Sequence, residues 1–143
     1  MTPRIEILRA IIQAWKAKDV EAVLAHMDEE IVWHFAVAAE PPLRGKAQAR
    51  KFLQRFGAGM NDIRWRVFDY LESGDRLFVE GVDEFVTDEG HTVMAPYAGV
   101  LDFRGDLVLG WRDYVDVGVM AAQRGGAPAT DQVKSLVDRA AVF

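Results

Sequence analysis

The chain contains no cysteine, only two serines and only one asparagine among its 143 residues. The lack of cysteine excludes a disulfide framework, a thiolate nucleophile and any metal site built on thiolates. Neither Ser73 nor Ser135 lies in a Gly-x-Ser-x-Gly elbow, which argues against a Ser–His–Asp hydrolase. Asn61 is followed by Asp62 and Ile63, so the sequence has no acceptor for N-linked glycosylation.

Positive charge and long apolar runs are also scarce. The 17 Lys and Arg residues against 22 Asp and Glu residues give a net charge of −5, which argues against a nucleic-acid partner. No apolar run approaches the roughly 18 residues that a membrane-spanning helix needs, and the first residues carry no hydrophobic signal core. We therefore expect a soluble, cytoplasmic protein of one domain that contacts neither nucleic acid nor a membrane.

Apolar residues recur at helical spacing in the first part of the chain and at every second position afterwards. This pattern predicts helices near residues 5–15, 20–27 and 45–56, and strands at 31–37, 63–71, 77–87, 93–103 and 107–116. The order is typical of an α+β domain with N-terminal helices packed in the concave face of a strongly curved, mostly antiparallel sheet. Residues 1–124 are expected to form this domain, and residues 125–143 a linker and a C-terminal tail helix.

Two aspartates occur on the apolar faces of predicted strands. Side chains alternate between the two faces of a strand, and Asp83 shares its face with Val79 and Phe85. Asp113 likewise shares its face with Trp111. A buried carboxylate is unfavourable unless it is paired, hydrogen-bonded or protonated, so a single inward aspartate is more often a satisfied structural residue. Two in phase, on strands joined by a short meander, favour a functional pocket inside the concave face.

Carboxylates in one pocket can differ in protonation, so one can act as a base and the other as an acid. Asp69 has the parity of an inward residue but lies nearer to a turn, which makes it a weaker candidate. The histidines show no metal-ligand spacing, and the glycines at 57 and 59 form no dinucleotide fingerprint, so we expect neither a metal nor a cofactor. The side chains expected to wall the pocket and bind substrate are Trp33, Phe35, Trp65, Tyr97, Leu101 and Trp111.

Three stretches carry a family resemblance. The opening, with Ala14-Trp15, Asp19-Val20-Glu21-Ala22-Val23-Leu24 and Ile31-Val32-Trp33, resembles nuclear-transport-factor-2-like domains, which include polyketide cyclase-like proteins. Pro42-Leu43-Arg44-Gly45-Lys46-Ala47 resembles the loop into their third helix. Glu80-Gly81-Val82-Asp83 and Gly110-Trp111-Arg112-Asp113-Tyr114-Val115-Asp116 are similar to the limonene-1,2-epoxide hydrolase branch. The resemblance covers most of the chain and implies a cone-shaped α+β barrel around a pocket.

The resemblance also implies roles for the two aspartates. In that branch the residue matching Asp113 takes a proton from water, and the residue matching Asp83 protonates the epoxide oxygen. The family has a bridging arginine two residues before the acid and a Tyr-x-Asn pair that holds the water, but this chain has Gly81, Trp33 and Phe35 at those positions. Without the arginine, repulsion and desolvation are expected to raise the pKa of at least one aspartate above about 3.9. The pair is expected to bind one proton near neutral pH, with no guanidinium between the two carboxylates.

These features predict an epoxide hydrolase-like enzyme that applies acid/base catalysis to a small hydrophobic substrate, with Asp113 as the base and Asp83 as the acid. Since the water-holding residues are missing, an isomerase or cyclase of the polyketide cyclase-like type using the same pair is an alternative, and so is a non-catalytic small-molecule-binding domain. A homodimer is expected, because apolar residues have outward parity on the sheet. These outward residues are Phe68, Tyr70, Phe78, Val82, Val100 and Val108.

Overall fold

The computed structural model describes residues 2–37 and 39–143. The helices are α1 (Arg4–Lys16), α2 (Val20–Leu24), α3 (Gly45–Ala58), α4 (Val117–Arg124) and α5 (Asp131–Val137). The strands are β1 (Met27–His34), β2 (Leu43–Arg44), β3 (Arg66–Ser73), β4 (Arg76–Val86), β5 (Thr92–Arg104) and β6 (Leu107–Val115). No helix among the described residues combines the length and the apolar character that crossing a membrane requires.

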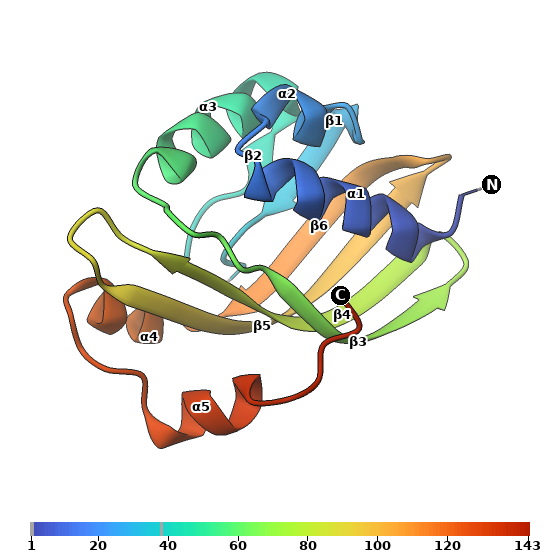
Figure 1. The fold of residues 1–143 in the computed structure, drawn as a ribbon. Helices are drawn as coiled ribbons and strands as arrows, with labels where there is room; N and C mark the ends of the chain where they lie inside the picture. Colours follow the sequence, from blue (N-terminus) through green and yellow to red (C-terminus); the bar gives the residue numbers. More distant parts are fainter. Residues whose placement is uncertain (1, 38) are drawn as a thin grey trace.

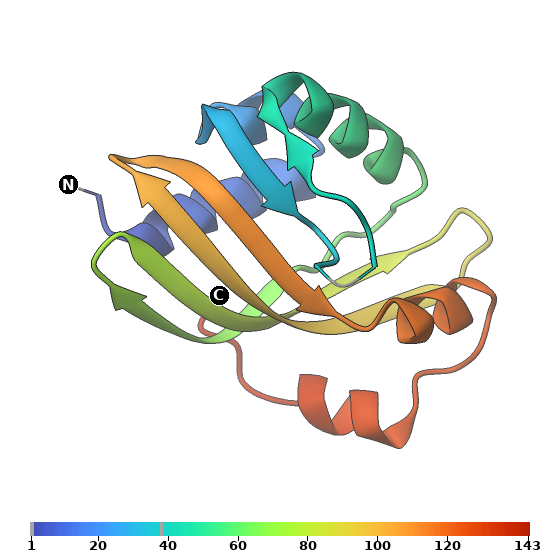
Figure 2. The same ribbon diagram turned by 180° about the vertical axis from the view of Figure 1, so that it is seen from behind.

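The strands form one sheet with the order β2-β1-β6-β5-β4-β3. Every neighbouring pair is antiparallel except β1 and β6, which run parallel. The long strands curl, and α1, α2 and α3 lie on the concave side, while α5 lies on the other side (Figures 1 and 2). The expected α+β fold, with N-terminal helices in the concave face of a mostly antiparallel sheet, is confirmed.

The main core lies between the inner face of the sheet and the helices on it. Helix α1 contributes an apolar stripe that includes Leu8, Ile12 and Trp15, all buried. The chain then turns sharply, and the Asp19 side chain caps α2 by accepting a hydrogen bond from the backbone N–H of Ala22 at 3.1 Å. These helices pack on the inner face of the sheet, and residues of α1, α2, α3 and α4 line a cavity there.

Two irregularities in strand pairing change which residues face inward. Pairing shifts between Asp102 and Phe103, so Val108 faces Phe103 and is fully buried in the main core. The prediction that Val108 lies on the outer face is therefore wrong, because simple alternation fails at the bulge. A second bulge in β3 lies between Val67 and Asp69, and Asp69 is exposed. Asp69 consequently does not line the pocket.

Helix α5 and the chain after it cover part of the outer face of the sheet (Figure 2). Phe68 and Val82 are buried there against Val133 and Val137 of α5. Beyond α5, the backbone pairs with β3: the Val142 N–H donates to the Val67 carbonyl oxygen at 2.8 Å. Two residues predicted for a dimer interface are thus covered within the chain. The homodimer itself stays a prediction. Of the predicted interface residues, Tyr70 and Phe78 remain exposed, with 42% and 39% of their surface accessible.

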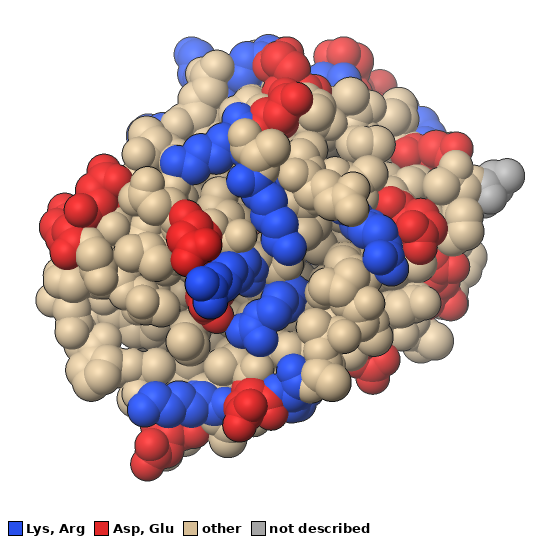
Figure 3. Space-filling model, in the orientation of Figure 1, with Lys and Arg blue, Asp and Glu red and all other residues tan. Residues whose placement is uncertain are grey.

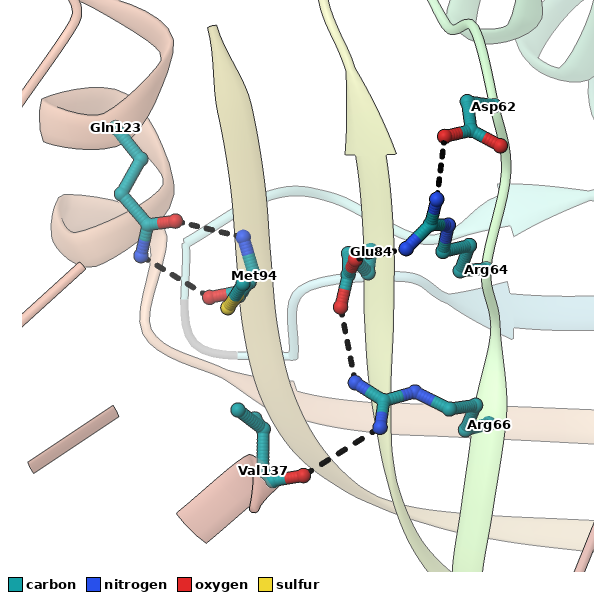
Figure 4. Close-up of polar contacts among 7 residues, drawn as sticks. All are labelled: Asp62, Arg64, Arg66, Glu84, Met94, Gln123 and Val137. Carbon is teal, nitrogen blue, oxygen red and sulfur yellow. Dashed lines mark hydrogen bonds and ion pairs between the residues drawn. The ribbon is translucent and has the colours of Figure 1, made fainter. Parts of the chain in front are cut away.

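Charged side chains of both signs are interleaved over the surface seen in Figure 3. Glu84 is 8% exposed, and its Oε1 accepts a hydrogen bond from Arg66 at 2.9 Å (Figure 4). Arg66 also donates to the carbonyl oxygen of Val137 at 3.4 Å, at the end of α5. The Arg66–Glu84 ion pair therefore fixes the tail helix against β3 and β4.

Helix α4 was not predicted from the sequence pattern. Asp116 caps it by accepting from the backbone N–H groups of Gly118 and Val119 at 2.9 and 3.1 Å. Near its end, the buried Gln123 side chain binds both backbone groups of Met94: the Met94 N–H donates to Gln123 Oε1 at 2.6 Å, and Gln123 Nε2 donates to the Met94 carbonyl at 3.0 Å (Figure 4). Because β6 ends before it reaches this part of β5, Gln123 takes the place of a strand partner and fixes α4.

Candidate active site

A cavity of about 260 Å³ lies between the inner face of the sheet and residues of α1, α2, α3 and α4. Five of the six predicted substrate-binding side chains line it: Trp33, Phe35, Trp65, Tyr97 and Trp111. The described lining does not include Leu101, which is fully buried in the main core beside Trp111 and Leu77. Leu101 has the inward parity that was predicted, but it lies further along β5 than the cavity extends.

The aromatic wall leaves one polar atom without a partner. Trp33 stacks on Trp111 with ring centroids 5.4 Å apart, and Trp111 in turn lies 6.0 Å from Trp65. The Trp33 indole is 7% exposed, and its buried Nε1 has no hydrogen-bond partner among the described residues. A buried N–H without an acceptor is unfavourable, so this part of the wall carries an unsatisfied hydrogen-bond donor.

Asp83 and Asp113 both line the cavity, as predicted from strand alternation. Asp83 lies on β4 opposite Ala95, and Asp113 lies on β6 opposite Gly99, so β5 passes between them. Asp113 Oδ1 accepts a hydrogen bond from Trp111 Nε1 at 3.0 Å, whereas Asp83 Oδ1 is buried without a partner in the described part of the chain. A Cβ at Gly99 would lie 2.7 Å from Asp113 Oδ1, so glycine makes space for this carboxylate.

Tyr97 stands on β5 between the levels of the two aspartates. It pairs with Gly81, and a Cβ at Gly81 would lie 2.9 Å from the Tyr97 hydroxyl oxygen. Trp65 Nε1 donates a hydrogen bond to that oxygen at 2.6 Å, which leaves the Tyr97 O–H proton free to be donated. The Tyr97 hydroxyl therefore occupies the space over Gly81, the position at which the epoxide hydrolase pattern has an arginine.

Both carboxylates favour the protonated form. Burial raises the pKa of Asp83 to about 6, and the positive charge of Arg124 partly opposes this. Burial raises the pKa of Asp113 to about 8; the Trp111 hydrogen bond opposes this rise, and the charge of Asp83 adds to it. Burial also raises the pKa of Tyr97, with Asp113 as the next cause. The two aspartates thus keep a proton to a higher pH than ordinary aspartates do, and they titrate as a pair.

The sequence pattern did not predict that residues of α4 line the cavity. Arg124 lines the cavity with its guanidinium carbon 5.0 Å from the ring centroid of Phe85 and 5.4 Å from that of Phe56. It forms no ion pair with either aspartate within the described ranges, so no guanidinium bridges them. The signals that could have located α4 were the capping Asp116 followed by apolar residues and then Gly125.

Four other arginines on or near the sheet have ion-pair partners away from the cavity. These pairs are Arg64 with Asp62, Arg66 with Glu84, Arg104 with Asp28, and Arg112 with Asp102. The charged groups left at the described cavity wall are Asp83, Asp113, Glu40 and Arg124. The arrangement can therefore exchange protons with a bound molecule in a mostly apolar space.

The family model of SnoaL-like domains matches residues 8–111, which is more than half of the chain. The chain belongs to the SnoaL-like family. No curated protein matches its sequence.

Solved structures with the same NTF2-like fold include an LEH-like epoxide hydrolase from M. tuberculosis, with 20% identity and a TM-score of 0.72 over 86% of this SnoaL-like chain and 90% of that protein. A candidate SnoaL-like polyketide cyclase from Shewanella denitrificans has 15% identity and a TM-score of 0.77 over 87% and 98%. IdmH, a candidate polyketide cyclase from Streptomyces antibioticus, has 16% identity and a TM-score of 0.73 over 87% and 99%. At these identities the similarity establishes the shared fold.

Proposed function

We propose that this SnoaL-like chain is an enzyme that transfers protons on a small hydrophobic substrate without a cofactor. The observation that carries the proposal is the placement of two carboxylates with raised pKa values, Asp83 and Asp113, in one mostly apolar cavity. Strongly perturbed acids in a cleft are typical of catalytic groups. Acids with values close to neutral pH are also the best suited to proton transfer there.

One aspartate of the pair is the proton acceptor and the other, protonated, is the donor. The limonene-1,2-epoxide hydrolase resemblance implies Asp113 as the acceptor and Asp83 as the donor. The acceptor would take a proton from an acidic C–H or O–H group of the substrate. The donor would give its proton to an oxygen on which negative charge develops, and the free Tyr97 O–H would donate a hydrogen bond to that oxygen.

The reaction class favoured by the cavity wall is isomerisation or ring closure of the bound substrate. Trp33 and Phe35 stand where the epoxide hydrolase pattern holds a water molecule with a tyrosine and an asparagine. An apolar wall does not fix an attacking water, but it does strengthen electrostatic interactions with a substrate and excludes competing hydrolysis.

The test combines substrates with matched variants. Small enolisable aromatic ketones would be offered in deuterated water, and carbon-bound deuterium would be measured by mass spectrometry. Asp83→Asn and Asp113→Asn are each expected to reduce incorporation by at least about 100-fold, because an amide cannot exchange the proton. Asp69→Asn, at an exposed aspartate, is the control and should match the wild type. Wild-type rates in both cavity variants would refute the proposal, and a ligand recovered unchanged would favour a binding domain instead.

Epoxide hydrolysis is the second candidate, favoured by the unpaired Nε1 of Trp33. This buried N–H could hold a water molecule or an epoxide oxygen beside the aspartates. Terpene and styrene-type epoxides assayed for diol in ¹⁸O-labelled water separate the two reactions. Labelled diol would establish hydrolysis, whereas an unlabelled, isomeric product would establish rearrangement.

A further inference from the structure

Arg124 is a cationic group at the cavity wall for which the proton-transfer mechanism has no use. Its guanidinium forms no ion pair within 4.0 Å and no side-chain hydrogen bond among the described residues. Its charge nevertheless reaches the cavity, since it lowers the pKa of Asp83 against the effect of burial. Arg124 is exposed and lacks a carboxylate partner in the described part of the chain, whereas most other arginines facing this sheet are paired with carboxylates.

The backbone and side chain of Arg124 are both held in place. Its carbonyl oxygen accepts a hydrogen bond from His91 Nδ1 at 2.8 Å, and the preceding residue, Gln123, is fixed to the backbone of β5. The guanidinium lies over the rings of Phe56 and Phe85, on α3 and β4. Aromatic faces attract a cation without using its N–H donors. The five donors of the guanidinium thus stay available at a fixed place on the wall.

A basic residue in the last turn of a helix also interacts favourably with the helix dipole, which is an alternative role for Arg124. The dipole explains a positive charge at the end of α4, but it does not explain why the charge lies over the ring of Phe56, which lines the cavity, and over the buried ring of Phe85. Glu40 lines the same cavity and could have neutralised Arg124, but no ion pair joins them in the described part of the chain. The donors therefore remain for a ligand.

We propose that Arg124 is a specificity-determining residue that binds an anionic oxygen group, foremost a carboxylate, on an otherwise aromatic or alicyclic substrate. The proposal rests on the proposed function in that it names the substrate class of the same cavity. The guanidinium would bind the carboxylate through paired N–H donors, and the hydrophobic body would lie against Trp33, Phe35 and Trp65. This places one end of the substrate at α4 and directs the reacting part towards Asp83 and Asp113.

The test uses two probes of equal shape, 2-naphthoate and the neutral 2-naphthamide, with binding measured by titration calorimetry at neutral pH. The wild type is expected to bind the acid more tightly than the amide. Arg124→Gln is expected to weaken the binding of 2-naphthoate by about fivefold to tenfold, and the effect is moderate because the residue is exposed. The same substitution is expected to change the affinity for 2-naphthamide by less than about twofold. Arg124→Lys should recover part of the loss.

Two matched variants control for charge. Lys134→Gln removes an exposed positive charge from α5, on the other side of the sheet, and should change neither affinity. Glu40→Gln removes a negative charge from the cavity wall and should not weaken 2-naphthoate. Equal weakening of both probes by Arg124→Gln would reduce the residue to a packing role. No preference for the acid in the wild type, or no effect of the substitution, would overturn the proposal.

The binding test is independent of turnover. Asp113→Asn should bind 2-naphthoate at least as tightly as the wild type while lacking activity, because it removes a proton-transfer group and not the anion contact. Acid-selective binding that depends on Arg124, in a protein whose aspartate variants keep wild-type deuterium exchange, would support this inference and refute the proposed function. If the aspartate variants lose deuterium exchange but the wild type does not prefer the acid over the amide, the proposed function is supported and this inference is refuted.

Discussion

Replacing Asp113 with asparagine is expected to make the folded protein more stable at neutral pH while abolishing turnover. The wild-type carboxyl lies in a cavity where burial raises its pKa to about 8, from an ordinary value of 3.8. At pH 7 the unfolded chain ionises this group freely, whereas the folded chain must keep it mostly protonated. Asparagine has nearly the same shape, can still accept the hydrogen bond from Trp111, and has no charge to lose.

The magnitude follows from the difference between the two pKa values. Each pH unit between them corresponds to about 1.36 kcal/mol. At pH 7, about three pH units above 3.8, ionisation of Asp113 stabilises the unfolded chain but not the folded one. The folded state is therefore destabilised by at most about 4 kcal/mol. Relaxation around the buried carboxyl lowers this penalty, so we expect Asp113→Asn to raise the free energy of unfolding by about 2–4 kcal/mol.

The sign of the pH dependence distinguishes this cause from simple repacking. A carboxyl whose pKa is raised in the folded state favours folding fully below 3.8, and that contribution is lost as the pH rises towards about 8. Urea unfolding of the wild type and the variant should therefore give similar free energies near pH 4 and diverge by pH 7. Asp69→Asn, at an exposed site, should show no such divergence. A difference of equal size at both pH values, or a destabilised variant at pH 7, would refute the reasoning.

Packing around the cavity and the state of assembly give further outcomes. Gly81→Ala is expected to lower the free energy of unfolding by about 1–3 kcal/mol in urea, because its Cβ meets the Arg66 carbonyl and Tyr97 hydroxyl oxygens. Gly59→Ala, where a Cβ meets open space, is the control and should change stability by less than about 0.5 kcal/mol. Trp33→Phe removes the unpaired N–H and should keep stability within about 1 kcal/mol but slow turnover, as initial rates would show. A homodimer is still expected, and light scattering that gives the 16.0 kDa monomer mass at micromolar concentration would contradict it.

Strand alternation predicted the inward aspartates correctly because β4 pairs with β5 without interruption, and residues 97–102 of β5 pair regularly with residues 110–115 of β6. Asp83 and Asp113 both lie within such regular stretches. The same rule failed at Val108 and Asp69, each of which lies beside a shift in strand pairing. A bulge depends on how two strands fit together, so the sequence of one strand does not reveal it.

The sequence pattern predicted the tail helix but not what it covers, and it missed α4 altogether. Helix α4 has eight residues, and glycine follows its first position, so its apolar periodicity is weak. Its position depends on Gln123, which binds backbone groups of Met94 that no strand pairs on that side. Local spacing carries no information about an unpaired strand edge 29 residues away in the chain. The cationic side of the cavity, including Arg124, was missed for this reason.

Gly81 and Tyr97 together explain why a shared fold need not imply shared chemistry. The epoxide hydrolase pattern has an arginine at the position of Gly81, and its positive charge would favour two ionised carboxylates. In this chain a neutral phenol fills that space, fixed by the hydrogen bond from Trp65, and a Cβ at position 81 has no room. The phenol cannot offset the burial of Asp83 and Asp113, so both pKa values remain high. The raised pKa values are the reason why we propose proton transfer within a substrate rather than activation of water.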